Sequence, residues 1–419
     1  MAYVIHFFTS EETNEVGCGL ESSKLSTAQL SDFELVRVMK KFVGNDEHLP
    51  DSIYVLPIIE QWKKAFLATM EKWAVLFPKL NEVISLVSKL EEGRYLGISL
   101  NETIEYLDKK EILFKMQELE RGISAKQRLD EFLSQNELWM RIYKPCCYVP
   151  NERIRFGVQE RAKRICRYCG KRMPETTFKK DAHTISNCLG NIFFFTNDEC
   201  DECNTKFGAG IEQEFVNYIS IYRTLAAQYE GHPYFTTHTA SFRLDVDKYT
   251  NKIRFDILDN SKARIKSSEK QTDIYVDGGY INYHDVYRAL VKFVMGMLPD
   301  EQLPFFKDTI KWINGEVNLT QLPVVKETIY SEPIQHPSIN MFFRKNESDE
   351  YPYLVAELHV NHLEFVFVVP GCQLDTFEIK ANVLDDFIKL RKDNNRWKNL
   401  DMRRPQPTHM QLHAIFYVK

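Results

Sequence analysis

The sequence predicts a multidomain α+β protein, because three kinds of pattern follow one another along its 419 residues. Apolar residues at helical spacing fill the first third, two pairs of cysteines lie near the middle, and strand-like segments fill the last third. A chain of this length exceeds one ordinary hydrophobic core. We therefore predict a mainly helical domain at 1–145, a central domain around the cysteines at 150–230, and an α+β domain at 231–419 with an antiparallel sheet.

The first domain is predicted to be a bundle of about four or five amphipathic helices. Apolar residues recur three and four positions apart over 59–77 and again over 80–90. Two further helices are expected near 102–121 and 124–140. The aromatic residues of these helices are expected to form core, and residues 4–8 alternate as in a short strand.

The last domain is predicted from a change of period. Four segments have the composition or alternation of strands: 235–244, 252–258, 353–360 and 363–369. One helix is expected over 283–298, ended by Pro299. His359 and His362, with Glu357 nearby, lie in the strand-rich part and are expected to be structural rather than metal ligands.

The composition, 44% hydrophobic and 27% charged, is typical of a soluble globular protein. The first residues lack the basic start and apolar core of a signal peptide, and no apolar run approaches the ~18 residues of a spanning helix. Nine cysteines without the spacing of a disulfide framework favour a reducing compartment. We expect a cytoplasmic protein.

A basic segment precedes and enters the cysteine region. The net charge of the chain is −5, yet residues 152–180 hold ten Lys or Arg against three Glu. Such a run can be a solvated surface or a track for nucleic-acid phosphates, and the second interpretation is favoured beside a catalytic site. The preferred contacts are Arg161, Lys163, Arg164 and Arg167.

The cysteine pairs Cys166/Cys169 and Cys200/Cys203 are spaced like two zinc knuckles. Four thiolates complete the tetrahedron of one Zn²⁺ and leave no position for water, so this ion would be structural. Its binding can fold an element that lacks a core of its own. One alternative is a zinc ribbon that binds nucleic acid or protein without catalysis.

The residues between and after the knuckles favour catalysis. Asp181 and His183 are two apart in a strand-like segment and would share a face, while Asn204 follows the last cysteine. A carboxylate and a carboxamide suit Mg²⁺ or Mn²⁺, and a histidine can act as general base on water. These groups can hydrolyse a phosphodiester, leaving a 5′-phosphate and a 3′-hydroxyl. A lone strand histidine can also be structural.

Three segments, 166–171, 178–191 and 200–208, closely resemble the HNH endonuclease family in its four-cysteine ββα-metal branch. The resemblance implies a β-hairpin followed by a helix around one divalent ion. It also implies that His183 is the general base and that Asp181 and Asn204 are ligands of the catalytic ion. Ala182 stands where many members have an acidic residue. Three asparagines are candidates for the middle polar residue of the motif, with a turn role as the alternative for Asn191: Asn187, Asn191 and Asn197.

By this resemblance the substrate is expected to be DNA, double-stranded, with an RNase using the same site as an alternative. Similar modules often serve prokaryotic defence or mobile elements, so such a setting is expected by analogy. The N-terminal helical domain is expected to bind a protein partner or an activator.

Overall fold

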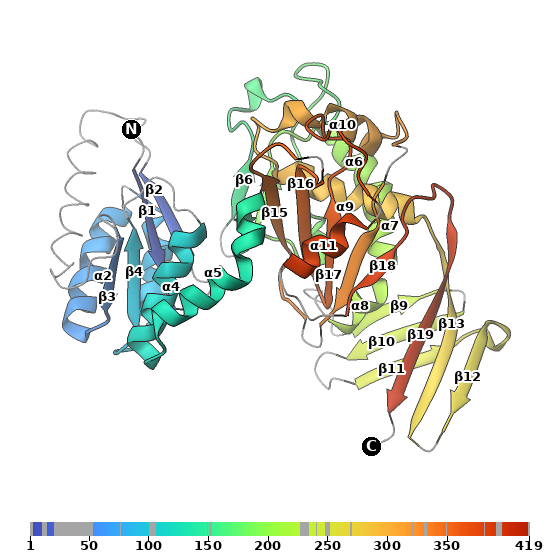
Figure 1. Ribbon diagram of the computed structural model, residues 1–419, viewed down its shortest axis with the longest axis horizontal. Coiled ribbons are helices and arrows are strands. Elements are labelled where there is room, and N and C mark those ends of the chain that lie inside the picture. The colour runs from blue at the N-terminus through green and yellow to red at the C-terminus, as the bar shows by residue number, and fades with distance from the viewer. Residues whose placement is uncertain are drawn as a thin grey trace. The chain divides into compact units, whose positions relative to one another are not determined.

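The computed structural model describes residues 3–10, 15–20, 53–75, 77–99, 106–148, 150, 153–226, 234–239, 241–247, 252–268, 270–319, 322–330, 333–348, 350–380, 382–390 and 396–417. The chain divides into two compact units, Met1–Glu137 and Leu138–Lys419 (Figure 1).

The first unit contains a four-stranded antiparallel sheet in the order β2-β1-β4-β3. The strands are β1 (Tyr3–Phe8), β2 (Glu15–Leu20), β3 (Ile53–Pro57) and β4 (Tyr95–Ser99). The helices are α2 (Glu60–Ala74), α3 (Leu80–Ser88), α4 (Tyr106–Arg121) and α5 (Ala125–Ile142), the last of which continues into the second unit.

Helices cover both faces of this sheet. Phe66 of α2 and Val83 of α3 pack in one cluster with Phe7, whereas Met116 of α4 packs with Phe8 in another. Phe7 and Phe8 are neighbours in β1, and successive strand residues point to opposite faces. The first unit is therefore a helix–sheet–helix sandwich.

The four helices predicted between residues 59 and 140 are confirmed, as is the strand at 4–8. They do not form a bundle of their own, because a sheet lies between α2–α3 and α4. The strands β3 and β4 are short and pair across a long stretch of sequence, so the apolar pattern alone did not reveal the sheet. Residues 21–52 of the mainly helical domain predicted at 1–145 lie outside the described residues.

The second unit is built on a six-stranded antiparallel sheet in the order β18-β14-β17-β16-β15-β5. The strands are β5 (Tyr143–Tyr148), β14 (Val325–Ile329), β15 (Ser338–Arg344), β16 (Leu354–Val360), β17 (Leu363–Val368) and β18 (Lys398–Leu400). Pro145, the last residue of the predicted first domain, lies inside β5. A proline is tolerated there because β5 is an edge strand.

Each face of this sheet has its own hydrophobic core. Helix α11 (Val383–Leu390) covers one face, where Phe387 packs on Phe342. Helix α9 (Tyr283–Met297) covers the other and is buried along almost its whole length; it confirms the helix predicted over 283–298. The shorter helix α10 (Lys307–Asn314) packs beside α9, with Trp312 against Tyr287.

The cysteine-rich region packs on the other side of α9. It consists of β6 (Ile154–Phe156), β7 (Ala182–His183), β8 (Phe194–Thr196), α6 (Asp201–Ala209), α7 (Ile211–Tyr218) and α8 (Ser220–Leu225). The ring of Phe215 in α7 lies 5.4 Å from that of Phe293 in α9 and 5.6 Å from that of Phe365 in β17, between centroids. One continuous core thus joins the cysteine region, α9 and the sheet.

Two three-stranded sheets complete the second unit, in the orders β11-β10-β9 and β12-β13-β19. Their strands are β9 (Tyr234–His238), β10 (Phe242–Asp247), β11 (Lys252–Ile257), β12 (Ala263–Ser267), β13 (Gln271–Ile281) and β19 (Thr408–Tyr417). The strands predicted at 252–258, 353–360 and 363–369 are confirmed. The segment 235–244 is two strands rather than one, because the chain turns between β9 and β10.

The α+β class predicted from the sequence is confirmed, with antiparallel sheets in both units. Among the residues described, no helix has the length and apolarity that crossing a membrane requires.

Candidate metal centre and active site

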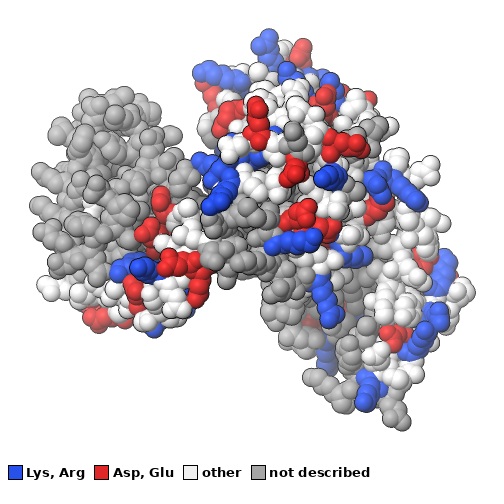
Figure 2. Space-filling model, viewed as in Figure 1, with Lys and Arg blue, Asp and Glu red and all other residues white. Residues whose placement is uncertain are grey.

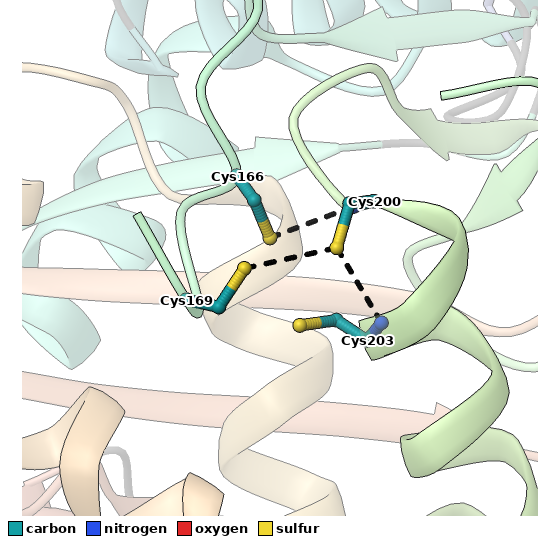
Figure 3. A group of neighbouring side chains, drawn as sticks. All are labelled: Cys166, Cys169, Cys200 and Cys203. Atoms are coloured by element: carbon teal, nitrogen blue, oxygen red, sulfur yellow. Dashed lines mark hydrogen bonds between the residues drawn. The ribbon is translucent and has the colours of Figure 1, made fainter. Parts of the chain in front are cut away.

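Four cysteine side chains converge where two turns of the chain meet (Figure 3). Cys166 and Cys169 lie in a tight turn closed by the Gly170 amide, which donates to the Cys166 carbonyl over 2.8 Å. Gly170 has a φ of 71°, a left-handed conformation that glycine adopts at no steric cost. Cys200 caps the N-terminus of α6, and Cys203 lies in its first turn. The four sulfur atoms lie within 4.8 Å of one another.

These four side chains fit a tetrahedral zinc ion. Sulfurs at ~2.3 Å from Zn²⁺ in a tetrahedron are about 3.8 Å apart, and Cys169 Sγ lies 3.7 Å from Cys200 Sγ. That separation is far longer than a disulfide bond. The backbone amides of Cys200 and Cys203 point at the sulfurs of Cys166 and Cys200, each over 3.5 Å, which favours thiolates. The cluster is therefore a metal-binding site suited to zinc.

The start of α6 is tied to the segment that leads to His183. The Asp201 carboxylate accepts hydrogen bonds from the amides of Lys179, over 3.1 Å, and Lys180, over 2.9 Å. In return, the Asp201 amide donates to the carbonyl of Thr177. Partial burial works against ionisation of Asp201, but the hydrogen bonds from Thr177 and these amides outweigh it and lower its pKa. Helix α6, which carries the second cysteine pair, thus fixes the segment before the candidate general base.

His183 lies on a small sheet of order β6-β8-β7. It is opposite Phe195 in the antiparallel β7–β8 pair, and the two rings are 4.5 Å apart between centroids. The backbone carbonyl of His183 faces Lys292 Nζ at 3.5 Å, while its imidazole remains half-buried on the outer face. The Lys292 ammonium group thus contacts the backbone of His183, and the imidazole stays partly exposed.

Asp181 and His183 interact electrostatically, and each shifts the pKa of the other. Asp181 is 58% exposed, and its Oδ1 lies 2.9 Å from Nη1 of Arg155. This hydrogen bond holds the pKa of Asp181 below its usual value. Burial lowers the pKa of His183, which outweighs the opposite effect of Asp181. At neutral pH the pair is therefore a carboxylate beside a neutral imidazole.

Asn204 lies in α6, directly after Cys203, and is half-buried. Its amide donates to the Cys200 carbonyl over 2.9 Å as part of the helix. The next residue, Thr205, accepts a hydrogen bond from Lys180 Nζ over 3.0 Å, which brings this turn of α6 to the segment before Asp181. The role of Asn204 as a metal ligand stays a prediction.

Asn191 is completely buried, and both ends of its amide are bonded to the backbone. Its Nδ2 donates to the carbonyls of Ile185 and Phe194, over 2.7 and 2.9 Å. Its Oδ1 accepts from the amides of Phe193 and Phe194. No group is left to touch substrate, so the geometry revises the predicted catalytic role of Asn191 to a positioning one: it closes the loop between β7 and β8.

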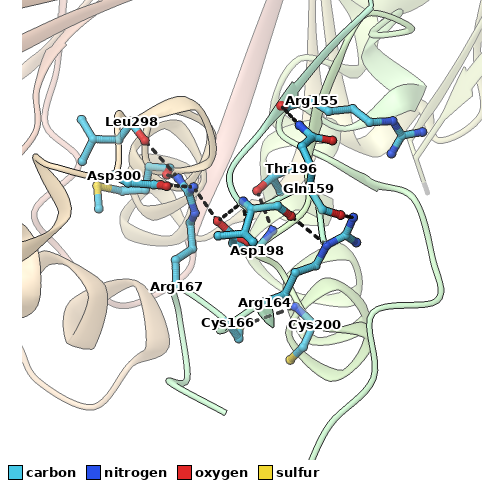
Figure 4. A network of polar contacts seen from close by, with 12 residues as sticks. Arg155, Gln159, Arg164, Cys166, Arg167, Thr196, Asp198, Cys200, Leu298 and Asp300 are labelled. Carbon is cyan, nitrogen blue, oxygen red and sulfur yellow. Dashed lines mark hydrogen bonds and ion pairs between the residues drawn. The ribbon is translucent and has the colours of Figure 1, made fainter. Parts of the chain in front are cut away.

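Arg167 cannot contact nucleic acid as predicted, because its side chain is only 1% exposed (Figure 4). Its guanidinium donates to the carbonyls of Met295 and Leu298 at the end of α9, over 2.6 and 3.2 Å. It also pairs with the carboxylates of Asp198, at 3.5 Å, and Asp300, at 3.2 Å. Arg167 therefore fastens the first zinc knuckle to α9.

The other three predicted contacts remain on the surface. Arg161 and Lys163 are exposed, and Lys163 pairs with Glu160 at 2.6 Å. Two of the N–H donors of Arg164 are already engaged, because its guanidinium donates to the carbonyls of Val158 and Gln159 (Figure 4). On the face shown in Figure 2, basic and acidic side chains are intermixed over the described residues. This face therefore has no continuous basic surface among the described residues, and an anionic ligand would be attracted by individual basic side chains.

A buried charge cluster that was not predicted from the sequence lies beneath His183. Lys292 of α9 is completely buried, and its Nζ lies 3.1 Å from Glu199 Oε2 and 2.6 Å from Glu212 Oε1. Burial alone would lower the pKa of Lys292, but the two carboxylates outweigh it and raise the pKa above its ordinary value. A single lysine among the apolar residues of 283–298 was the only signal in the sequence.

Replacing Lys292 by methionine is expected to lower the free energy of unfolding by about 3–5 kcal/mol, because two carboxylates would be left buried without their cation. Chemical denaturation measures the loss. As a control, Lys311→Met removes an exposed lysine paired with Asp308 and should change stability by less than about 1 kcal/mol. Equal stabilities of the Lys292 and Lys311 variants would contradict the role given to the buried cluster.

A second group of possible ligands is Glu357, His359 and Glu364, on β16 and β17. His359 Nε2 lies 3.1 Å from Glu364 Oε1, and Asn340 donates to Glu357 over 3.3 Å. Tyr330 also hydrogen-bonds Glu364. His359 is therefore paired with a carboxylate of the same sheet, and the structural role expected from the sequence stays a prediction.

Residues 166–220 match the family model described as HNH endonuclease. The matched segment begins at Cys166 and includes the second cysteine pair, His183, β8, α6 and α7. No curated protein and no solved structure was found to match the chain. Residues 166–220 therefore form a domain of the HNH endonuclease family.

Proposed function

We propose that this protein is a metal-dependent endonuclease that hydrolyses phosphodiester bonds in double-stranded DNA, with His183 as its general base. The observation that carries the proposal is the placement of His183 and Asp181 on a hairpin that Asp201 ties to the zinc-bearing helix α6. A four-thiolate zinc site has no open position for catalysis, so the chemistry is assigned to the oxygen and nitrogen side chains beside it.

Asp181 and Asn204 would hold a divalent ion, for which their oxygen atoms suit Mg²⁺ or Mn²⁺. Such an ion, when bound, stabilises negative charge on phosphoryl oxygens and on the leaving 3′ oxygen. His183 accepts a proton from the attacking water; its lowered pKa leaves the imidazole neutral and ready to do so. The products would be a 5′-phosphate and a 3′-hydroxyl.

The substrate is tested by incubating purified protein with duplex DNA, single-stranded DNA and RNA, each with Mg²⁺ or with EDTA. Mg²⁺-dependent cutting of duplex DNA supports the proposal. Cutting of RNA alone would show that the substrate is RNA instead of DNA, with the same proposed mechanism. Binding without cutting, unaffected by His183→Ala and abolished by Cys200→Ser, would favour the zinc-ribbon adaptor.

The cleavage rate should depend on pH through the protonation of His183. A general base must be deprotonated, and burial lowers the pKa of His183 from its ordinary value of 6.5, so the rate should rise with pH through a midpoint below 6.5 and level off above that midpoint. Single-turnover rates at saturating Mg²⁺ at each pH measure this profile. A bend above neutral pH would contradict the assignment.

A role in prokaryotic defence or mobile elements stays a prediction by analogy. Binding of a partner or an activating ligand by the first unit also stays a prediction.

A further inference from the structure

Strand β6 adds a third strand to the hairpin that carries His183. It pairs in parallel with β8 and places Arg155 opposite Phe195, while β7 places His183 opposite Phe195 on the other side. Residues directly opposite in paired strands share a face. Arg155, Phe195 and His183 therefore form one row across the sheet, and Arg153 lies two residues before Arg155 on the same face.

The guanidinium groups of Arg153 and Arg155 lie over the ring of Phe195, which also contacts His183. The central carbons of Arg153 and Arg155 are 4.5 and 5.0 Å from the centroid of the Phe195 ring. With His183 on the third side, Phe195 is only 2% exposed although it lies on the outer face of the sheet. An arginine stacked on a ring keeps the N–H groups at its edge for other partners. Phe195 thus orients two cations beside the general base.

The two arginines beside Phe195 differ in their ion pairs. Arg155 directs Nη1 to Asp181, whereas no ion pair of Arg153, which is exposed, is found among the described residues. Asp181 is the side chain that the proposed function gives to the divalent ion. Arg155 and that ion therefore compete for one carboxylate. A guanidinium released from Asp181 would be left beside His183 with its donors free.

We propose that Arg153 and Arg155 bind nucleic-acid phosphates next to the reacting bond, and that Arg155 passes from Asp181 to a phosphate when the divalent ion takes Asp181. This inference rests on the proposed function. It assigns to the face of β6 a phosphate-binding site, with Arg153 as a permanent contact and Arg155 as a contact that depends on the ion.

Nucleic-acid binding tests the first half. In the His183→Ala protein, which would bind without cutting, a short labelled duplex DNA is titrated with Mn²⁺ at several salt concentrations. Arg153→Ala and Arg155→Ala should each weaken binding and reduce the slope of log affinity against log salt by about one. Arg155→Lys, which keeps the charge, should retain most of the slope. The control Arg254→Ala, an exposed arginine on β11 paired with Asp256, should bind like its parent.

Ion binding without nucleic acid tests the second half. Arg155→Ala should bind Mn²⁺ about two- to fivefold more tightly, because the competing ion pair with Asp181 is gone. Arg254→Ala should again have no effect. Misfolding of Arg155→Ala would not be expected to weaken DNA binding and strengthen Mn²⁺ binding at the same time. Mn²⁺ binding can be followed by the loss of the free-ion spectrum in electron paramagnetic resonance.

The outcomes separate the two proposals. If wild-type protein cuts no nucleic acid, the proposed function fails. If it cuts while Arg155→Ala leaves the affinities for DNA and Mn²⁺ unchanged, the inference fails and the proposed function stands.

Discussion

Replacing His183 by alanine is expected to lower the cleavage rate by about 10²–10⁴-fold, the usual contribution of a general base. The change removes a half-buried ring that packs on Phe195 but makes none of the contacts that hold the cysteine cluster. The variant should therefore keep its zinc and its fold. Single-turnover cleavage, zinc content and thermal unfolding of the same preparation measure the three properties.

The matched control is His409→Ala, which removes an imidazole from β19 that pairs with Asp277 at 3.0 Å. It should cut at the wild-type rate. Equal rates for His183→Ala and His409→Ala would remove His183 from the chemistry. Loss of zinc or of folded structure in His183→Ala would instead show that the histidine is structural.

Replacing Cys200 by serine should have the largest effect on structure. Cys200 is completely buried and caps α6, and its sulfur accepts a hydrogen bond from the Cys203 amide. Structural zinc binding contributes about 10–16 kcal/mol to folding in small zinc domains, and loss of one thiolate forfeits much of it. We expect loss of the bound zinc, a less stable second unit and no cleavage.

Zinc content by elemental analysis and unfolding by denaturant test this expectation. Cys188→Ser is the control, because Cys188 lies in the same module but its sulfur contacts Ser186 and not the cluster. It should keep one zinc per chain. A Cys200→Ser protein that also keeps one firmly bound zinc would contradict the four-cysteine assignment.

The sequence predicted the cysteine cluster well, because a short spacing fixes which sulfurs can meet at one point. It also predicted α9 and the strands β16 and β17, whose apolar patterns are long and strong. Elements in which local pattern dictates structure were thus predictable.

Features that depend on distant contacts were not. Arg167 looks like the other basic residues around it, and only its contacts with 295–300 show that it is buried. The parallel pairing of β6 with β8 joins residues about 40 apart and alone brings Arg155 beside His183. Asn191 could not be separated from Asn187 and Asn197 until its four backbone hydrogen bonds were known.

The central claim is that zinc organises the site while a second, harder ion and His183 carry out the reaction. The most direct test is cleavage of a labelled duplex by zinc-loaded wild-type protein, first in buffer free of other divalent ions and then with Mg²⁺ added. We predict no product in the first condition and 5′-phosphate ends in the second. Product formed with zinc alone, at the rate seen with Mg²⁺, would contradict the claim.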